Sequence, residues 1–430
     1  MDLSRLPPEL VELIVAKIHF SHRDLERCCL VSSVFRPPCQ KRLFRRLAIS
    51  FSVPYAREWA CEAAANHFDA APHLAEYAHQ FVLDLSLDER KHPSAKIMQA
   101  LERVLPRLTR TREIRIFAWV EREIPEHFRI APMRAVLHWL AGRPRGATER
   151  LILEGALPLG KLDMHTVLTA ASNLYLKDLS VHPSDSAGRI AESPGNSNAL
   201  VELHAPNSAE VTELLLLPEF AHYMQSLRTL SLLIDKPLPL KALSDLCRAA
   251  ADTLERIVVN EWVFEDYSAE TSTEYDLDVL RLPLPTHLPH LRRLIVRADK
   301  LVSEPAFTPE WLLPDIAKIL PESVTPALRE VTIHVFVYMG PNTSLCPGPL
   351  PKALMRSLDE AFVKHPTLEI VTWVVCEAKQ KFVQEEEALE RAFEAAMKEA
   401  FPQTCQKGML FVALEAFRDI NDVMQRLDDR

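Results

Sequence analysis

A short pattern of apolar positions recurs along most of the chain after residue 51. Its first apolar residue is followed by a second three positions later and by a third after two more. Each copy is short, alternating and rich in branched residues, which predicts a β-strand. Eight copies begin with an apolar residue and two with threonine: Val82/Leu85/Leu87, Leu176/Leu179/Val181, Leu200/Leu203/Ala205, Leu227/Leu230/Leu232, Leu254/Ile257/Val259, Leu291/Leu294/Val296, Leu328/Val331/Ile333, Leu368/Val371/Trp373, Thr111/Ile114/Ile116 and Thr148/Leu151/Leu153.

Helical periodicity fills the intervals between most of these strands. Leu101, Val104 and Leu105 form one such pattern, and Leu354, Leu358 and Phe362 form another. The centres of successive copies lie roughly 24 to 40 residues apart, which is the range of solenoid repeats. One strand and one helix cannot bury an apolar face alone but can do so against neighbouring copies. We therefore expect an α/β fold, an irregular solenoid with a parallel sheet on its concave side. A non-repeat α/β sheet is the alternative.

The first 50 residues have a different, purely helical pattern. Pro7 and Pro8 suit a first helical turn, so a helix is expected from about Pro7, with an apolar stripe at Leu10, Leu13, Ile14 and Ile18. Ser21 and Asp24 resemble a capping box that opens a second helix through Cys28 and Cys29. A third helix is expected from about Ser33 to Leu47, bent or delayed by Pro37 and Pro38.

The other end of the chain is also expected to be helical. Residues 379–401 form an amphipathic pattern, with Phe393 and Met397 on its apolar side, which suits the cap of a solenoid. A partner-binding helix is the rival interpretation, whereas the pattern is too short for a coiled coil. A last strand is expected at Met409–Leu414 and a last helix at Glu415–Leu427. Loops are expected at Pro183–Asn198, Glu265–Asp278 and Pro341–Pro351.

Composition excludes several classes of function. A net charge of -9 argues against general binding of nucleic acid, and no run of about 18 apolar residues could span a membrane. Eight scattered cysteines are typical of reduced thiols in the cytoplasm or the nucleus. Only nine glycines are present, and the chain has no G-x-G-x-x-G, Walker A or G-x-S-x-G motif, which argues against nucleotide and serine-hydrolase chemistry.

Candidate chemistry is sparse. His19, His22, Cys28 and Cys29 come closest to a metal site, but adjacent cysteines lack the C-x-x-C spacing of structural zinc sites. No cofactor or metal is expected, and no enzymatic activity. The aromatic residues on or near the strands could anchor a bound protein or, as the commoner case, fill the core. They are Trp119, Trp262, Phe264, Phe336, Tyr338 and Trp373.

The order Leu6-Pro7-x-Glu9-Leu10, Asp24-Leu25, Leu30-Val31-Ser32 and Phe35 resembles an F-box over residues 1–50. The strand and helix pattern resembles degenerate leucine-rich repeats over residues 78–430, with a helical cap at 379–430 and a linker helix at 51–77. The polar ladder residue of that family is missing from most copies. By resemblance, the residues expected to contact or shape the adaptor surface are Leu6, Pro7, Leu10, Ile14, Leu30, Val31 and Phe35.

This combination implies a substrate-recognition subunit of a Skp/cullin/F-box ubiquitin ligase. Its F-box would bind a Skp-type adaptor and, through it, a cullin, while the repeats would bind an unknown protein target. The alternative is a non-catalytic repeat scaffold for protein–protein interaction that joins no ubiquitin ligase, with the first helices acting as an N-terminal cap.

Overall fold

The structure is a computed structural model of the 430-residue chain. It describes residues 6–17, 22–51, 59–85, 95–118, 127–155, 157–181, 200–205, 209–234, 244–263, 285, 287–300, 313–337, 352–378 and 386–417. The expected loops at 183–198, 265–278 and 341–351 lie outside the described residues. The chain divides into two compact units, Met1–Leu200 and Val201–Arg430.

The first unit begins with three helices, α1 (Pro8–Lys17), α2 (His22–Val31) and α3 (Arg36–Phe44). Pro37 and Pro38 occupy the first turn of α3, where a missing amide costs little, so they start the helix instead of bending it. The expected extension of this helix to Leu47 is wrong. Arg46–Ser50 forms a strand, β1, because Leu47 and Ile49 alternate with their neighbours and are buried against the helical layer.

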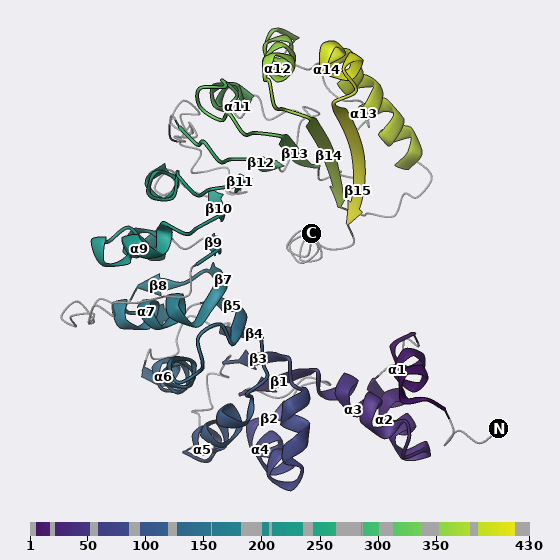
Figure 1. Cartoon of the computed structure of the whole chain (residues 1–430), viewed down its shortest axis with the longest axis vertical. Helices are drawn as coiled ribbons and strands as arrows, with labels where there is room; N and C mark the ends of the chain where they lie inside the picture. The colour runs from purple at the N-terminus through teal and green to yellow at the C-terminus, as the bar shows by residue number, and fades with distance from the viewer. Residues whose placement is uncertain are drawn as a thin grey trace, which may run out of the picture. The chain divides into compact units, whose positions relative to one another are not determined.

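The remainder of the first unit alternates strands with helices (Figure 1). The sheet order is β2-β1-β3-β4-β5-β7, and every pair is parallel. The helices lie on one face of this sheet, and β6 and β8 form a small parallel pair. The elements are β2 (Trp59–Ala60), α4 (Cys61–Ala70), η2 (Pro72–Tyr77), β3 (Gln80–Asp84), α5 (Ala95–Val104), η3 (Leu105–Arg107), β4 (Glu113–Ala118), α6 (His127–Ala141), β5 (Thr148–Gly155), β6 (Pro158–Leu159), α7 (Lys161–Ala170), β7 (Ala171–Lys177) and β8 (Ser180–Val181).

The second unit has the same construction. Its strands follow the chain in the order β9-β10-β11-β12-β13-β14-β15, again all parallel. The expected α/β class, with consecutive parallel strands alternating with helices in a solenoid-like manner, is therefore confirmed. The elements are β9 (Glu202–Ala205), α8 (Ala209–Leu215), η5 (Pro218–Phe220), α9 (Ala221–Met224), β10 (Thr229–Ile234), β11 (Arg256–Val263), β12 (Arg293–Lys300), α11 (Leu313–Ile319), β13 (Glu330–Val337), α12 (Lys352–Lys364), β14 (Ile370–Ala378), α13 (Glu386–Ala400), α14 (Pro402–Gln406) and β15 (Leu410–Phe417).

The repeated pattern forms the core because its three positions point toward the helices. In the copy Thr111/Ile114/Ile116 all three side chains are buried, and the Thr111 hydroxyl donates to the carbonyl of Ala78 at 2.9 Å. The parallel register places Ile114 beside Leu151 of β5. Corresponding positions of successive strands therefore form continuous apolar rows, which is how the repeats bury each other's faces.

Two copies of the pattern were assigned to the wrong register. In β3 the helix-facing residues are Phe81 and Leu83, which pair with Ile114 and Ile116, so Val82 lies on the opposite face. In β7 the corresponding residues are Leu174 and Leu176, whereas Leu179 and Val181 lie after the strand. In both cases alanine, at position 78 or 171, occupies the first position of the true copy, and its small side chain weakened the pattern.

Eight pairs of neighbouring strands among the described residues start with the same two backbone hydrogen bonds, which we name the strand-start ladder. The carbonyl of Arg45 accepts the amides of His79 and Gln80, both at 2.9 Å. Each further ladder carbonyl likewise accepts two successive amides that precede or open the next strand. These carbonyls belong to His79, Arg112, Val201, Arg228, Glu255, Arg292 and Arg329. The ladder gives hydrogen-bond partners to backbone amides and carbonyls that would otherwise have none where each strand begins.

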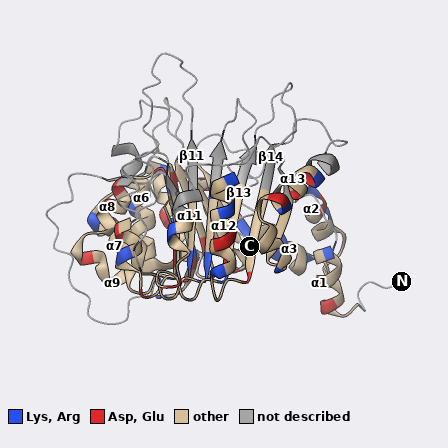
Figure 2. Ribbon diagram, turned by 90° about the horizontal axis from the view of Figure 1, so that it is seen from above, with Lys and Arg blue, Asp and Glu red and all other residues tan. Residues whose placement is uncertain are grey.

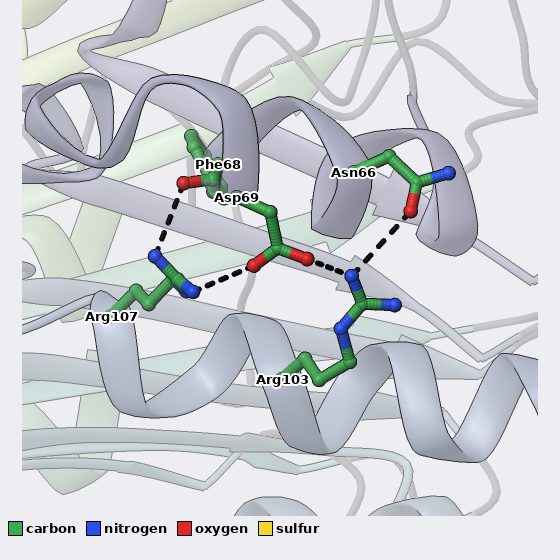
Figure 3. A network of polar contacts seen from close by, with 5 residues as sticks. All are labelled: Asn66, Phe68, Asp69, Arg103 and Arg107. Atoms are coloured by element: carbon green, nitrogen blue, oxygen red, sulfur yellow. Dashed lines mark hydrogen bonds and ion pairs between the residues drawn. The ribbon is translucent and has the colours of Figure 1, made fainter.

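Adjacent helices of the first unit are joined by charged side chains (Figure 3). Asp69 of α4 accepts a hydrogen bond from Arg103 of α5 and one at 2.6 Å from Arg107 in η3. Arg107 also donates to the carbonyl of Phe68 at 3.1 Å. These side chains are partly exposed, so the ion pairs add specificity to the helix packing more than stability.

The helix and the last strand expected near the C-terminus are both present, but the strand is longer than expected. The expected amphipathic helix is confirmed at Glu386–Ala400, with Phe393 and Met397 buried. The expected last strand is confirmed as β15, but it continues through Phe417, so the helix expected from Glu415 does not begin there. Residues 418–427 lie outside the described residues. Trp373 is fully buried, which places it in the core and not on a binding surface.

Positively and negatively charged residues are interspersed along the helices (Figure 2). Within the described ranges, no helix combines the length and the hydropathy needed to span a lipid bilayer.

Candidate functional site

The N-terminal helices pack around a small core of their own. Val15 of α1, Leu25 of α2 and Cys39 of α3 are buried together, and Phe35 and Leu43 pack against them. Three helices of this size can bury little apolar surface. Much of the apolar surface of the sequence pattern must therefore remain outside this core.

Large apolar side chains are exposed on two of these helices. Leu10 and Leu13 of α1 are 46% and 53% exposed, and Leu30 and Val31 of α2 are 83% and 77% exposed. In the described part of the chain, only Leu162 and Phe411 join them as exposed large apolar residues. Four of these six side chains thus lie within 22 residues of sequence, on the neighbouring helices α1 and α2.

The residues predicted to serve the adaptor surface divide into two groups. Leu10, Leu30 and Val31 are exposed, as is Pro7, whose carbonyl accepts the amides of Leu10 and Val11 and starts α1. Leu6, Ile14 and Phe35 are half-buried, and Phe35 supports the small core. The exposed residues lie on two different helices, α1 and α2.

Leu13 is an exposed residue that the predicted set omits. It belongs to the same apolar stripe as Leu10, three positions away on one side of a helix. Its place in that stripe was the available sequence signal. We name the four side chains Leu10, Leu13, Leu30 and Val31 the exposed apolar set.

The cysteines of this region lie together, with Cys28 and Cys29 packed against the small core that contains Cys39. Burial raises the pKa of the Cys39 thiol to about 12, with further contributions from Cys29 and Cys28, so this thiol is protonated at neutral pH. Among the described residues, no three His, Cys, Asp or Glu side chains are placed to hold a metal ion. His19, the remaining member of the sequence candidate, lies outside the described residues.

The helix-free face of the first sheet carries a charged cluster. Glu154 of β5 accepts hydrogen bonds from Arg115 of β4 at 2.7 Å and from Lys177 of β7 at 3.0 Å. The Arg115 guanidinium lies 5.7 Å from the centroid of the Phe117 ring. Burial acts to raise the pKa of Glu154, but the two cations outweigh it and hold the pKa below its usual value. This cluster is a fixed, ionised feature of the face.

The helix-free face of the second unit contains a buried histidine. His334 of β13 lies beside Arg297 of β12 in the parallel register, and both are buried. Burial, followed by the charge of Arg297, lowers the pKa of His334 from 6.5 to about 3. The folded protein therefore holds this imidazole neutral across the physiological pH range.

We expect this histidine to make the protein less stable in mild acid. Below pH 6.5 the unfolded chain binds a proton at His334, whereas the folded chain binds it only near pH 3. The free energy of unfolding should therefore fall with decreasing pH in this window, by up to about 1.4 kcal/mol per pH unit. Urea denaturation at pH 7 and pH 5 measures the loss. His334→Gln should show a smaller loss, and an equal loss in both proteins would contradict the assignment.

The comparisons with known proteins add no family to this picture. No protein-family model matches the sequence, and no curated protein matches it.

Proposed function

We propose that the chain is the substrate-recognition subunit of a Skp/cullin/F-box ubiquitin ligase. The helices α1–α3 bind the adaptor, and the strand–helix repeats bind a protein target. The chain itself carries out no bond chemistry; it raises the concentration of the target near an enzyme held elsewhere in the complex. The observation that carries the proposal is the exposed apolar set on helices that match the order of F-box residues.

The energetics favour a partner for this region. Burying a leucine side chain is worth about 1.5–3 kcal/mol relative to leaving it exposed, so four exposed apolar side chains forgo several kcal/mol in the free chain. A groove on an adaptor would recover that energy. The repeats offer a large surface for the target, including the Arg115–Glu154–Lys177 cluster on the helix-free face.

The proposal predicts a large loss of adaptor binding when the exposed apolar set becomes charged. Leu30→Asp with Val31→Asp should weaken binding of a purified Skp-type adaptor by about 100-fold or more, because apolar anchors dominate interface energies. Leu10→Asp with Leu13→Asp should have a similar effect. Isothermal titration calorimetry against the intact chain measures both.

Leu162→Asp provides the matched control, since Leu162 is 62% exposed but lies on α7, outside the helical region. It should leave adaptor binding unchanged. All substituted side chains are exposed, so the thermal midpoints should stay near that of the unaltered chain. If the unaltered chain does not bind the adaptor, or if the double variants bind as tightly as it does, the proposal fails.

One observation favours the alternative of a scaffold with a helical cap. The Phe44 ring at the end of α3 stacks on His67 of α4 at 5.4 Å, and β1 follows directly and pairs with β3. Deletion of residues 1–34 leaves α3 and β1 in place and separates the two functions. A cap should then lower the thermal midpoint of the remainder by several degrees, whereas an adaptor-binding module should leave it nearly unchanged.

A further inference from the structure

A second candidate site is a cavity in the first unit, with a volume of about 1000 Å³. Its lining comes from α1, α3, η2 and the residues that precede or open β3, β4 and β5. Three consecutive members of the strand-start ladder, Arg45, His79 and Arg112, lie along it. The volume is at the upper end of the range for ligand sites in proteins.

The carboxylates of the lining are already engaged. Each of the four accepts an ion pair or a hydrogen bond from another lining residue, which leaves little capacity for an incoming cation. The partners are Lys41 Nζ for Glu12 at 2.7 Å, Arg110 Nη2 for Glu76 at 3.5 Å, Arg112 Nη1 for Glu149 at 2.9 Å and Gln80 Nε2 for Glu113 at 2.9 Å.

The cations of the lining are in excess. Five Lys and Arg side chains face four Glu side chains, in a chain whose net charge is -9. Arg42 donates to the carbonyl of Val15, and neither Arg42 nor Arg45 forms an ion pair with a described residue. A carboxylate that enters the cavity would therefore find two guanidinium groups that pair with no carboxylate in the described part of the chain. Hydrogen bonds between such charged groups are stronger than those between neutral ones.

Helix α1 contributes both to the cavity and, through Leu10 and Leu13, to the exposed apolar set. At 100° per residue, Val15, which lines the cavity, lies opposite Leu10 and Leu13, whereas Ala16, which also lines it, lies next to Leu13 at the border between the two surfaces. No member of the exposed apolar set lines the cavity. The cavity therefore does not belong to the adaptor site proposed above.

We propose that this cavity binds an acidic peptide segment of a partner protein, with Arg42 and Arg45 receiving its carboxylates. The volume accommodates several residues, far more than a single small anion needs. The lining also includes Val15, Pro38 and Tyr77, whose apolar atoms suit the aliphatic stems of acidic side chains such as glutamate. The proposal holds whether or not the chain binds an adaptor.

The test is fluorescence anisotropy with a fluorescein-labelled hexaglutamate peptide and the full chain at an ionic strength of about 0.15 M. Arg45→Glu should weaken binding about tenfold or more, because it replaces an attraction by a repulsion. Arg46→Glu is the matched control: Arg46 is the next residue and is also exposed, but it does not line the cavity. Its effect should be below about twofold, since exposed charges outside the site are screened. Arg45→Gln should give an intermediate loss.

Folding and the adaptor proposal can be separated from this outcome. The ladder uses only the backbone carbonyl of Arg45, so the thermal midpoint of Arg45→Glu should be unchanged, as should its adaptor binding. The proposal is overturned if the two glutamate variants weaken peptide binding equally. It is also overturned if hexaglutamate at millimolar concentration does not saturate the protein. Binding of inorganic phosphate to the cavity without binding of hexaglutamate would overturn it in the same way.

Discussion

Replacement of Gly155 by alanine is expected to lower the free energy of unfolding by about 3 kcal/mol or more. Gly155 ends β5 with a φ of 94°, a conformation that costs energy for any residue with a Cβ atom. A Cβ atom at this position would lie 2.2 Å from the carbonyl oxygen of Ala118, its partner on β4. The clash is with backbone and cannot be relieved by a side-chain rotation. Urea denaturation of the full chain measures the loss.

Gly408→Ala separates backbone strain from the clash. Gly408 also has a positive φ, 72°, but no atom lies within 4 Å of a Cβ atom built there. Only the conformational cost of about 1 kcal/mol is expected at this position. Equal losses for the two variants would show that the close approach of β4 and β5 at Gly155 is not the cause.

Trp373→Ala has the second large expected effect, a loss of about 3–5 kcal/mol. The side chain is fully buried on the helix-facing side of β14, and its ring centroid lies 5.4 Å from that of Phe401. Phe401 in turn packs 5.9 Å from Phe362 of α12. Truncation therefore opens a cavity where the terminal helices meet the sheet. Circular dichroism in urea measures the loss, because removal of one of the six tryptophans changes the fluorescence signal itself.

Trp373→Phe is the matched variant. The indole Nε1 is buried without a hydrogen-bond partner among the described residues, so its removal gives up no such bond. The smaller ring keeps most of the aromatic packing, and a loss below about 1.5 kcal/mol is expected. If phenylalanine is as costly as alanine, the contribution of Trp373 comes from something other than its packed volume.

The fold could be predicted where all three positions of the repeated pattern hold sizeable side chains. The copies around Ile257, Leu294 and Val331 have the predicted register because nothing competes with their periodicity. At β7 the true copy starts with Ala171, which contributes little hydrophobicity, and the stronger sequence Leu176/Leu179/Val181 was chosen in its place. The prediction for β7 followed the local hydrophobicity of the sequence. In the structure, pairing with the neighbouring strand determines which residues form β7.

The two candidate sites differ in how far the sequence could predict them. The exposed apolar set was largely predictable. Leu10 and Leu13 form one apolar stripe on a helix, and a module of three short helices is too small to bury both side chains. The charged cavity was not. It joins Glu12, Arg45 and Arg112, which are far apart in sequence and are brought together only by the parallel register and the packing of α1 and α3.

The strand-start ladder also bears on how such a chain can change its length. Each ladder carbonyl receives the same pair of amides from the segment that follows it, whatever side chains that segment carries. A duplication or loss of one whole strand–helix segment therefore presents the next pair of amides to an equivalent carbonyl, and the backbone junction is restored. Recombination between segments can lengthen or shorten a protein of this construction one repeat at a time, while its ends remain intact.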